Sequence, residues 1–189
     1  MSGAGRRGLV EVPEVAALAT STKIKTLLAR HLGDRVTVVR AIYFDKSPGA
    51  NWSVTWHQDL LVAVQKRTEI AGFGPWSVKD GTPHVQPPVH YLEQMLTVRL
   101  HLDDTDEGNG ALRVIPGSHQ FGQMSSQAID QLARAEREVI CSSAAGGALL
   151  MRPLLLHASR RSAGNRHRRV VHLEYAAGFD LPAGLRWKA

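Results

Sequence analysis

The sequence predicts one domain of the mainly β class, folded as a sandwich or barrel with little helix beyond its N-terminal third. Short runs rich in β-branched and aromatic residues recur along the chain, and several alternate apolar with polar residues. Turn signals built from Gly, Pro, Asn and Asp separate these runs. The 189 residues are enough for a single domain with a real core, and we find no internal repeat or domain boundary in residues 1–189.

The composition is ordinary for a globular protein, with 43% hydrophobic and 21% charged residues. No stretch approaches the roughly 20 apolar residues of a membrane helix, and residues 1–12 lack the apolar centre of a secretory signal. The single cysteine, Cys141, rules out an internal disulfide. We therefore expect a cytoplasmic protein with no membrane partner.

A basic cluster near the C-terminus contributes much of the formal net charge of +6. Its members are Arg160, Arg161, Arg166, His167, Arg168 and Arg169. Such a run can attract nucleic acid or an acidic substrate, but a solvated loop is the commoner outcome. We expect its exposed members to face solvent and no nucleic acid as partner.

The N-terminal third is expected to be helical. Residues 1–11 are interpreted as a flexible tail, and residues 13–31 as one helix with Pro13 in its first turn and Gly33 as its C-terminal cap. The apolar stripe of this helix consists of Val15, Leu18, Ile24, Leu27 and Leu28.

The rest of the chain is expected to form strands, with one further helical segment at residues 125–138. Strands are predicted at 35–44, 52–60, 94–102, 111–115, 147–151 and 168–175, with a turn at 45–49. Residues 60–67 (LLVAVQKR) either continue the second strand or start another. Residues 67–92, rich in Gly and Pro, are interpreted as a long loop, either a lid over a site or a surface excursion.

The segment WSVTWHQDL, residues 52–60, places His57 and Asp59 two positions apart in a predicted strand. Residues i and i+2 of a strand project to the same face, so an imidazole and a carboxylate point together. With one more His, this is the donor set of the facial triad that holds Fe(II) in non-haem oxygenases.

The third ligand candidate is His157, which ends an apolar run. Alone, such a His is more often a core residue, but the strand that follows presents Arg168 on the same face as His172 and Glu174. An Arg facing a barrel interior is costly unless an anion meets it, and a guanidinium matches a carboxylate well. The pattern indicates a metal site beside a carboxylate-binding site.

These motifs give the chain a specific resemblance to a known family. The segments that carry it are WHQD (56–59), LDDTDEGNGALRVIPGSH (102–119), RPLLLHAS (152–159) and RRVVHLEY (168–175). In this order they resemble the phytanoyl-CoA dioxygenase family of Fe(II)/2-oxoglutarate oxygenases, over most of residues 35–176. The resemblance implies a double-stranded β-helix, which is a jelly-roll barrel of the cupin type.

The resemblance also implies the residues of the site. Fe(II) would be held by His57, Asp59 and His157, and 2-oxoglutarate would pair its distal carboxylate with Arg168. Arg169 is the competing choice because the two arginines are adjacent. Ser159 and Arg99 match positions that line the co-substrate pocket of the family.

The function implied is hydroxylation of a small organic substrate with O₂ and 2-oxoglutarate, and the carboxylate at Asp59 argues against a related halogenase. Two alternatives stay open: a catalytically silent metal- or ligand-binding barrel acting as a sensor or nucleic-acid-associated module, and an iron-dependent isomerase or epimerase. The helical region before the barrel is shorter than is usual in the family. The substrate pocket is therefore expected to be shallow, completed by a partner subunit in a homo-oligomer, or closed by residues 67–92.

Several other residues have a structural and a functional interpretation. Asp103, Asp104 and Asp106 are expected to form turns, since their spacing lacks the pattern of a calcium loop. His101 and His119 are possible ligands only if His157 is not one, and Cys141 is expected in the core. The candidate substrate contacts are Trp56, Trp76, His84 and His90.

Overall fold

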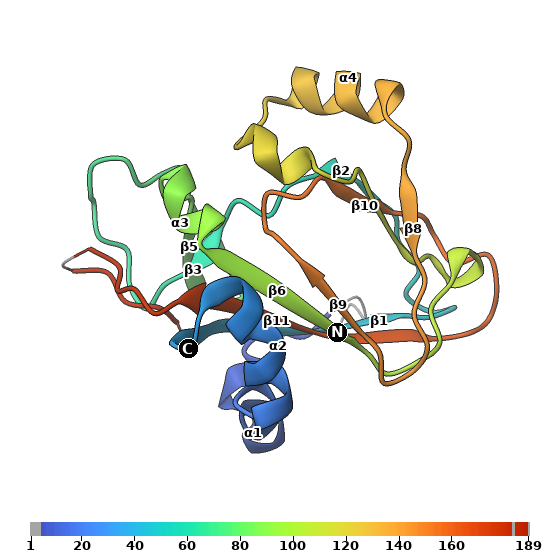
Figure 1. Cartoon of the computed structure of the whole chain (residues 1–189), viewed down its shortest axis with the longest axis horizontal. Helices are drawn as coiled ribbons and strands as arrows, with labels where there is room; N and C mark the ends of the chain where they lie inside the picture. Colours follow the sequence, from blue (N-terminus) through green and yellow to red (C-terminus); the bar gives the residue numbers. More distant parts are fainter. Residues whose placement is uncertain (1–4, 183, 189) are drawn as a thin grey trace.

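Two four-stranded antiparallel sheets face each other, with helices on their outer sides and a small third sheet at one end (Figure 1). The structure is a computed structural model that describes residues 5–182 and 184–188. The strands are β1 (Val36–Lys46), β2 (Val54–His57), β3 (Val62–Ala63), β4 (Trp76–Lys79), β5 (Thr82–Val85), β6 (Met95–His101), β7 (Leu112–Val114), β8 (Val139–Cys141), β9 (Ala148–Met151), β10 (His157–Ser159) and β11 (Arg168–Ala177). The α-helices are α1 (Pro13–Ala19), α2 (Thr22–Leu32), α3 (Val89–Glu93) and α4 (Ser126–Ala135), and the 3₁₀ turns are η1 (Leu9–Glu11), η2 (Glu107–Asn109) and η3 (Ser118–Phe121).

The chain passes back and forth between the two large sheets. The first sheet has the order β1-β11-β6-β9 and the second has the order β2-β10-β7-β8, so β1 and β2 lie in different sheets. All of these pairs are antiparallel. The prediction of a mainly β jelly roll of the double-stranded β-helix type is confirmed.

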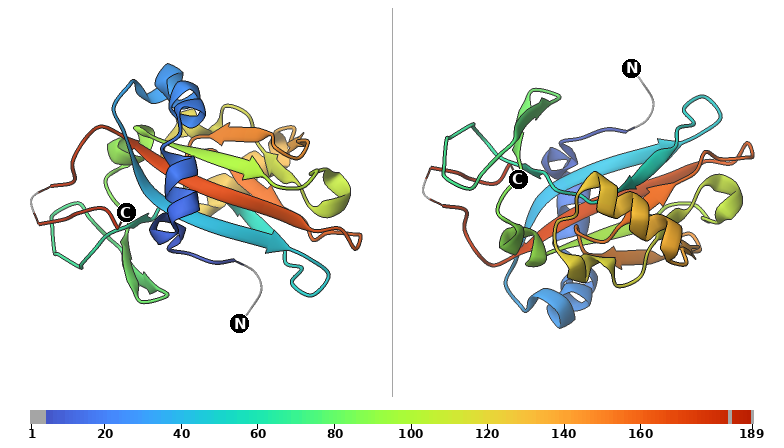
Figure 2. Two further views of the ribbon diagram at one scale, coloured as in Figure 1. Left: turned by 90° about the horizontal axis from the view of Figure 1, so that it is seen from below. Right: turned by 90° about the horizontal axis from the view of Figure 1, so that it is seen from above.

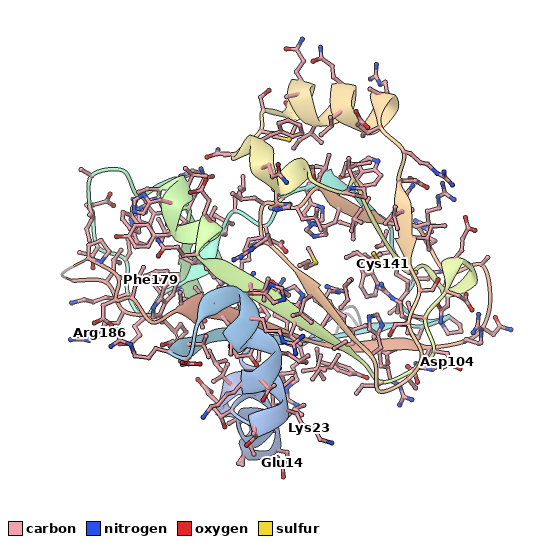
Figure 3. The ribbon with its side chains drawn as sticks, in the orientation of Figure 1. Glu14, Lys23, Asp104, Cys141, Phe179 and Arg186 are labelled. Carbon is pink, nitrogen blue, oxygen red and sulfur yellow. The ribbon has the colours of Figure 1, made fainter. Side chains whose placement is uncertain are left out.

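Strand β11 divides the interior of the barrel from the helical layer. Its residues Val171, Leu173 and Tyr175 pack with Ile24 and Leu28 of α2 in one apolar cluster. Figure 2 shows α1 and α2 lying across the outer face of this sheet, and Figure 3 shows Glu14 and Lys23 pointing away from it. The alternate residues of β11, from Arg168 to Glu174, therefore face the space between the sheets.

The expected single helix at 13–31 is wrong, because the chain breaks between α1 and α2. Thr20 and Ser21 leave the helical conformation, and the Thr20 hydroxyl donates to the carbonyl of Ala16 at 2.9 Å. Ser and Thr side chains compete for backbone hydrogen bonds in this way, which favours helix ends over helix interiors. Tyr175 holds the junction by donating to the carbonyl of Ala19 at 3.0 Å.

The expected flexible tail is also wrong for residues 5–11; residues 1–4 lie outside the described part of the chain. Arg6 and Tyr43 exchange two backbone hydrogen bonds of 2.8 Å, which adds a bridge at the edge of β1. Leu9 in η1 is buried against the helical layer.

Residues 67–92 contain more structure than a loop. Strands β4 and β5 form a hairpin around Asp80-Gly81, and both turn residues have positive φ, as a two-residue hairpin turn requires. Strand β5 also pairs with β3, and α3 follows. The surrounding Gly and Pro residues obscured this alternation in the sequence.

Strands β1 and β2 end at other residues than predicted, and strand β8 was not predicted. Strand β1 continues to Lys46, so the predicted turn at 45–49 begins only at Ser47. Strand β2 covers only Val54–His57, which leaves Asp59 just beyond its end. Strand β8 at Val139–Cys141 has no counterpart among the predicted strands.

Candidate metal centre

His57, Asp59 and His157 come together between the two large sheets. His57 ends β2 and lies directly opposite His157, the first residue of β10. Each of the three offers a ligand atom, and these atoms lie within 4.8 Å of one another. The carboxylate of Asp59 is 3.9 Å from Nε2 of His57 and 3.5 Å from Nε2 of His157. Two imidazoles and a carboxylate thus converge from separate parts of the chain.

Backbone carbonyls fix the tautomer of both histidines. Nδ1 of His57 lies 2.8 Å from the carbonyl oxygen of Thr55, and Nδ1 of His157 lies 2.8 Å from that of Leu155. A carbonyl only accepts, so each Nδ1 carries a proton and each Nε2 is the ring nitrogen that lies toward Asp59. Metal-binding histidines are oriented by hydrogen bonds of this kind.

The protonation states also suit a metal. Burial lowers the pKa of His157 to about 4, so its imidazole is neutral at pH 7. Burial alone would raise the pKa of Asp59, but electrostatic interactions with the neighbouring His157, His172 and Arg40 side chains outweigh burial and hold this pKa well below its ordinary range. His157 and Asp59 are therefore in the deprotonated forms that bind a metal.

Gln58 lies between two of these residues and joins three segments around the cluster. Its Nε2 donates to the carbonyls of Leu154 at 2.7 Å and Gly122 at 2.8 Å, while its Oε1 accepts from the amide of Met124 at 2.9 Å. The sequence offers no signal for this role beyond the position of Gln58 inside the metal motif.

Three buried cations line the space next to the cluster. Lys46, Arg99 and Arg168 are 0%, 5% and 3% exposed, and none forms a salt bridge within residues 5–182 and 184–188. Nε and Nη1 of Arg168 and Nε of Arg99 have no hydrogen-bond partner. Burial and the neighbouring arginines lower the pKa of Lys46 to about 7, and burial together with Arg99 lowers that of Arg168 to about 9. Such a group of cations calls for an anion.

Lys46 connects these cations to the histidine cluster. It lies opposite Arg168 in the β1–β11 pair, and its Nζ donates to Oγ of Ser159 at 3.2 Å and to the carbonyl of Arg160. Ser159 follows His157 by two residues in β10. Lys46 was not among the site residues predicted from the sequence. Phe44 and Lys46 are two positions apart in β1, so the alternation of the strand places both on its inner face.

The two adjacent arginines have different surroundings. Arg168 points into the barrel, whereas Arg169 is exposed and makes a bidentate ion pair with Asp103 at 2.9 and 2.6 Å. Of the two, Arg168 alone has unpartnered donors facing the interior. The geometry favours Arg168 as the anion-binding residue.

A hydrogen-bonded chain crosses the wall that faces the cluster. Arg99 donates through Nη1 to Nδ1 of His172 at 2.8 Å, and Nε2 of His172 donates to Glu174 at 2.9 Å. Arg40 donates to the same carboxylate oxygen of Glu174. Because a guanidinium only donates, His172 must accept at Nδ1 and is neutral.

The remaining candidates have structural surroundings. Arg160 pairs with Glu107 and Glu138, and Arg166 pairs with Asp106, so the exposed basic residues form ion pairs on the surface. Asp106 caps η2 and accepts from the amide of Asn109.

Two further side chains do not belong to the cluster. Cys141, seen in Figure 3, packs on Leu112 and Val114, and burial raises the pKa of its thiol. Nδ1 of His101 bonds the Thr105 hydroxyl at 2.9 Å, and burial with Arg99 and Arg168 lowers the pKa of this imidazole to about 4.

Comparison with known proteins gives the family. The model of the phytanoyl-CoA dioxygenase (PhyH) family matches residues 6–170, so the chain belongs to this family. A search of curated proteins finds no match. Within residues 5–182 and 184–188, no helix is long and apolar enough to cross a membrane.

Solved structures share the fold at low sequence identity. AviO1 from Streptomyces viridochromogenes Tue57 is 21% identical with a TM-score of 0.65, over 95% of this chain and 67% of that one. EctD from S. alaskensis, solved with 2-oxoglutarate and 5-hydroxyectoine, is 20% identical with a TM-score of 0.69, over 92% and 56%. SnoK, a non-heme alpha ketoglutarate dependent carbocyclase from nogalamycin biosynthesis, is 16% identical with a TM-score of 0.62, over 87% and 58%. This chain thus spans little more than half the length of EctD and SnoK.

Proposed function

We propose that this protein is an Fe(II)- and 2-oxoglutarate-dependent dioxygenase that hydroxylates a small organic substrate. One observation carries the proposal: two imidazoles and an ionised carboxylate converge on one point, beside three buried cations that have no carboxylate partner among residues 5–182 and 184–188. Membership of the PhyH family supports it, as does the EctD structure solved with bound Fe.

His57, Asp59 and His157 would hold the iron, which supplies the activation of O₂ and the oxidative decarboxylation of 2-oxoglutarate. Arg168 and Lys46 would bind the distal carboxylate of 2-oxoglutarate, and the Ser159 hydroxyl lies within reach of the same group. The unpartnered donors of Arg168 would then gain the anion that they lack.

The surrounding side chains keep these groups in place. The carbonyls of Thr55 and Leu155 hold the two imidazoles by Nδ1, and Gln58 fixes the segment that carries Asp59. The chain from Arg99 through His172 to Glu174 occupies the interior that water would otherwise fill. Asp59 contributes the carboxylate that a halogenase of this type would lack.

The alternatives are less well supported. A silent barrel would be expected to have lost one of the metal-binding side chains or the arginine, and all four are present and oriented inward. An isomerase on the same scaffold would not consume 2-oxoglutarate. The single cysteine supports a reducing, cytoplasmic setting.

The test is anaerobic titration of the protein with Fe(II) and 2-oxoglutarate. We expect a weak visible absorption from metal-to-ligand charge transfer, and slow formation of succinate after air is admitted. His57→Ala should abolish both, whereas His90→Ala, which changes an exposed histidine outside the cluster, should leave both intact. Absence of both signals in the wild type would refute the proposal.

A further inference from the structure

A cavity of about 970 Å³ is separate from the candidate metal centre in its lining, which includes none of His57, Asp59 and His157. Residues 5–11, the edge of β1 and the β4–β5 hairpin surround it. Ala63, in its wall, follows Asp59 by four residues, a reach of at most about 14 Å. Arg40, also in the wall, donates to Glu174 in the barrel interior. The cavity has the size of a small-molecule site, and Ala63 and Arg40 connect its wall to the segment after Asp59 and to the barrel interior.

The polar face of the small sheet forms one wall of this cavity. Residues directly opposite each other in antiparallel strands share a face, and His84 is opposite both Ala63 and Ser77, while Lys79 is opposite Thr82. The other face carries Val62, Val85 and Trp76, which pack in the apolar core. The hairpin therefore presents a polar side to the cavity and an apolar side to the protein.

Two polar atoms on this face of the small sheet have no hydrogen-bond partner among residues 5–182 and 184–188. His84 is 1% exposed, and its Nδ1 lies 2.9 Å from the carbonyl oxygen of Thr82, so Nδ1 carries the proton and Nε2 is an acceptor. Nε2 of His84 and the hydroxyl of Ser77 opposite it are both buried without a hydrogen bond. Buried polar groups rarely lack a hydrogen-bond partner, which indicates that a ligand supplies a donor to Nε2 of His84.

The charges around the cavity are unevenly paired. Its acidic residues are all engaged: Glu11 with Lys188, Asp80 with Arg7 and Asp45 with His167, each at 2.8 Å. Among the described residues, Lys79 and Arg6 have no carboxylate within 4.0 Å, and Lys79 shares the His84 face. Burial, Arg40 and Arg7 all lower the pKa of Lys79, a cost that a bound anion would offset.

We propose that this cavity binds the primary substrate, and that the substrate is a small organic acid that also carries a hydroxyl or amide N–H group. Its carboxylate pairs with Lys79, and Arg6 at the rim adds positive charge. Its donor group bonds Nε2 of His84. The assignment of a substrate rests on the proposed dioxygenase function, whereas the binding of the acid does not.

The test uses three probes of similar size with the full chain: 6-hydroxyhexanoate, hexanoate and 1,6-hexanediol. Calorimetry or ligand-observed NMR gives the dissociation constants. We expect the wild type to bind 6-hydroxyhexanoate most tightly. Lys79→Met should weaken it by about tenfold or more, and Lys79→Arg should restore it. Lys25→Met, which removes an exposed lysine on α2, is the matched control and should change nothing.

A variant of His84 tests the hydrogen bond between the donor group of the acid and Nε2 of His84. His84→Leu should abolish the preference for 6-hydroxyhexanoate over hexanoate, with circular dichroism confirming that the variant is folded. The proposal is overturned if no probe binds the wild type or if Lys79→Met binds as the wild type does. It is equally overturned if binding is lost in Arg168→Leu but not in Lys79→Met, because the acid then occupies the co-substrate pocket.

The same preparations separate this proposal from the dioxygenase proposal. Lys79→Met and His84→Leu should keep the absorption with Fe(II) and 2-oxoglutarate. A wild type without that absorption refutes the dioxygenase, whatever the cavity binds. A wild type with it, but with probe affinities unaffected by Lys79→Met, refutes only the organic-acid site.

Discussion

Lys46 shows at the scale of one residue how function opposes stability in this fold. Its side chain is fully buried between Arg168 and Arg99, with hydrogen bonds only to Ser159 and a carbonyl. An apolar side chain of similar length would avoid the cost of burying a charge. An unfavourable buried charge of this kind is expected where a protein forms a ligand site, here a site for an anion.

The pKa of Lys46 predicts an unusual dependence of stability on pH. The pKa of Lys46 in the folded protein is about 7, below its ordinary value of 10.5, so between these pH values the unfolded chain binds a proton that the folded chain does not. The loss of unfolding free energy caused by the buried Lys46 side chain is therefore largest below pH 7, and it decreases as the pH rises toward 10.5. Without metal and 2-oxoglutarate, Lys46→Met should gain more unfolding free energy at pH 6 than at pH 9.5, by on the order of 2 kcal/mol.

Urea unfolding at the two pH values measures this difference, with Lys25→Met as the control for an exposed lysine. The difference between the two pH values is diagnostic, because the lost hydrogen bonds of Lys46 lower stability equally at both. A loss of stability that is independent of pH would show that Lys46 is not a strained cation.

The adjacent arginines offer a matched pair for the co-substrate. Arg168→Leu should raise the KM for 2-oxoglutarate by about tenfold or more, because it removes a charge-assisted contact to the distal carboxylate. Arg169→Leu removes the same side chain one position away, where it pairs with Asp103 on the surface, and should leave KM within about twofold. Succinate formation at varied 2-oxoglutarate measures both, and equal effects would contradict the assignment.

At the scale of elements, Gln58 is the connection on which the geometry of the metal motif depends. It joins the end of β2 to the segment after η3 and to the turn before β10. Gln58→Leu keeps the volume but leaves two carbonyls and one amide unpaired, so unfolding free energy should fall by about 2–4 kcal/mol. Chemical denaturation measures it, with the exposed Gln127→Leu on α4 as control. A loss below about 0.5 kcal/mol would mean that water replaces these bonds.

Elements with regular alternation were predictable from the sequence. The existence of strand β11 followed from its run of β-branched and aromatic residues, whereas the choice of Arg168 over the adjacent Arg169 rested on the family resemblance. The pairing of His57 with His157 did not follow from the local pattern, because their register depends on contacts between distant segments. The expected convergence rested on the family resemblance.

The differences between the predicted and the observed elements have local causes. The β4–β5 hairpin is short, follows Pro75 and contains Pro83 in β5, so its Asp80-Gly81 turn was interpreted as part of a loop. Lys46 precedes Ser-Pro-Gly, which marked the region as a turn one residue too early. The break at Thr20-Ser21 was hidden because the apolar stripe continues across both helices.

At the scale of the whole molecule, the site draws its parts from both sheets. The candidate metal ligands come from β2 and β10 of the second sheet and from the segment that directly follows β2. Lys46, Arg99 and Arg168 come from β1, β6 and β11 of the first sheet. A co-substrate that contacts the metal at one end and Arg168 at the other would therefore link the two layers of the barrel.

This division predicts that metal and co-substrate stabilise the fold cooperatively. Mn(II) with 2-oxoglutarate should raise the Tm by more than the sum of the two separate shifts. A coupling of about 1–3 kcal/mol corresponds to an excess of several °C for a protein of this size. Arg168→Leu should keep the shift with Mn(II) alone and lose the excess, because the link to the first sheet is gone. Differential scanning fluorimetry of both proteins measures these shifts, and strictly additive shifts in the wild type would contradict a co-substrate that spans the two sheets.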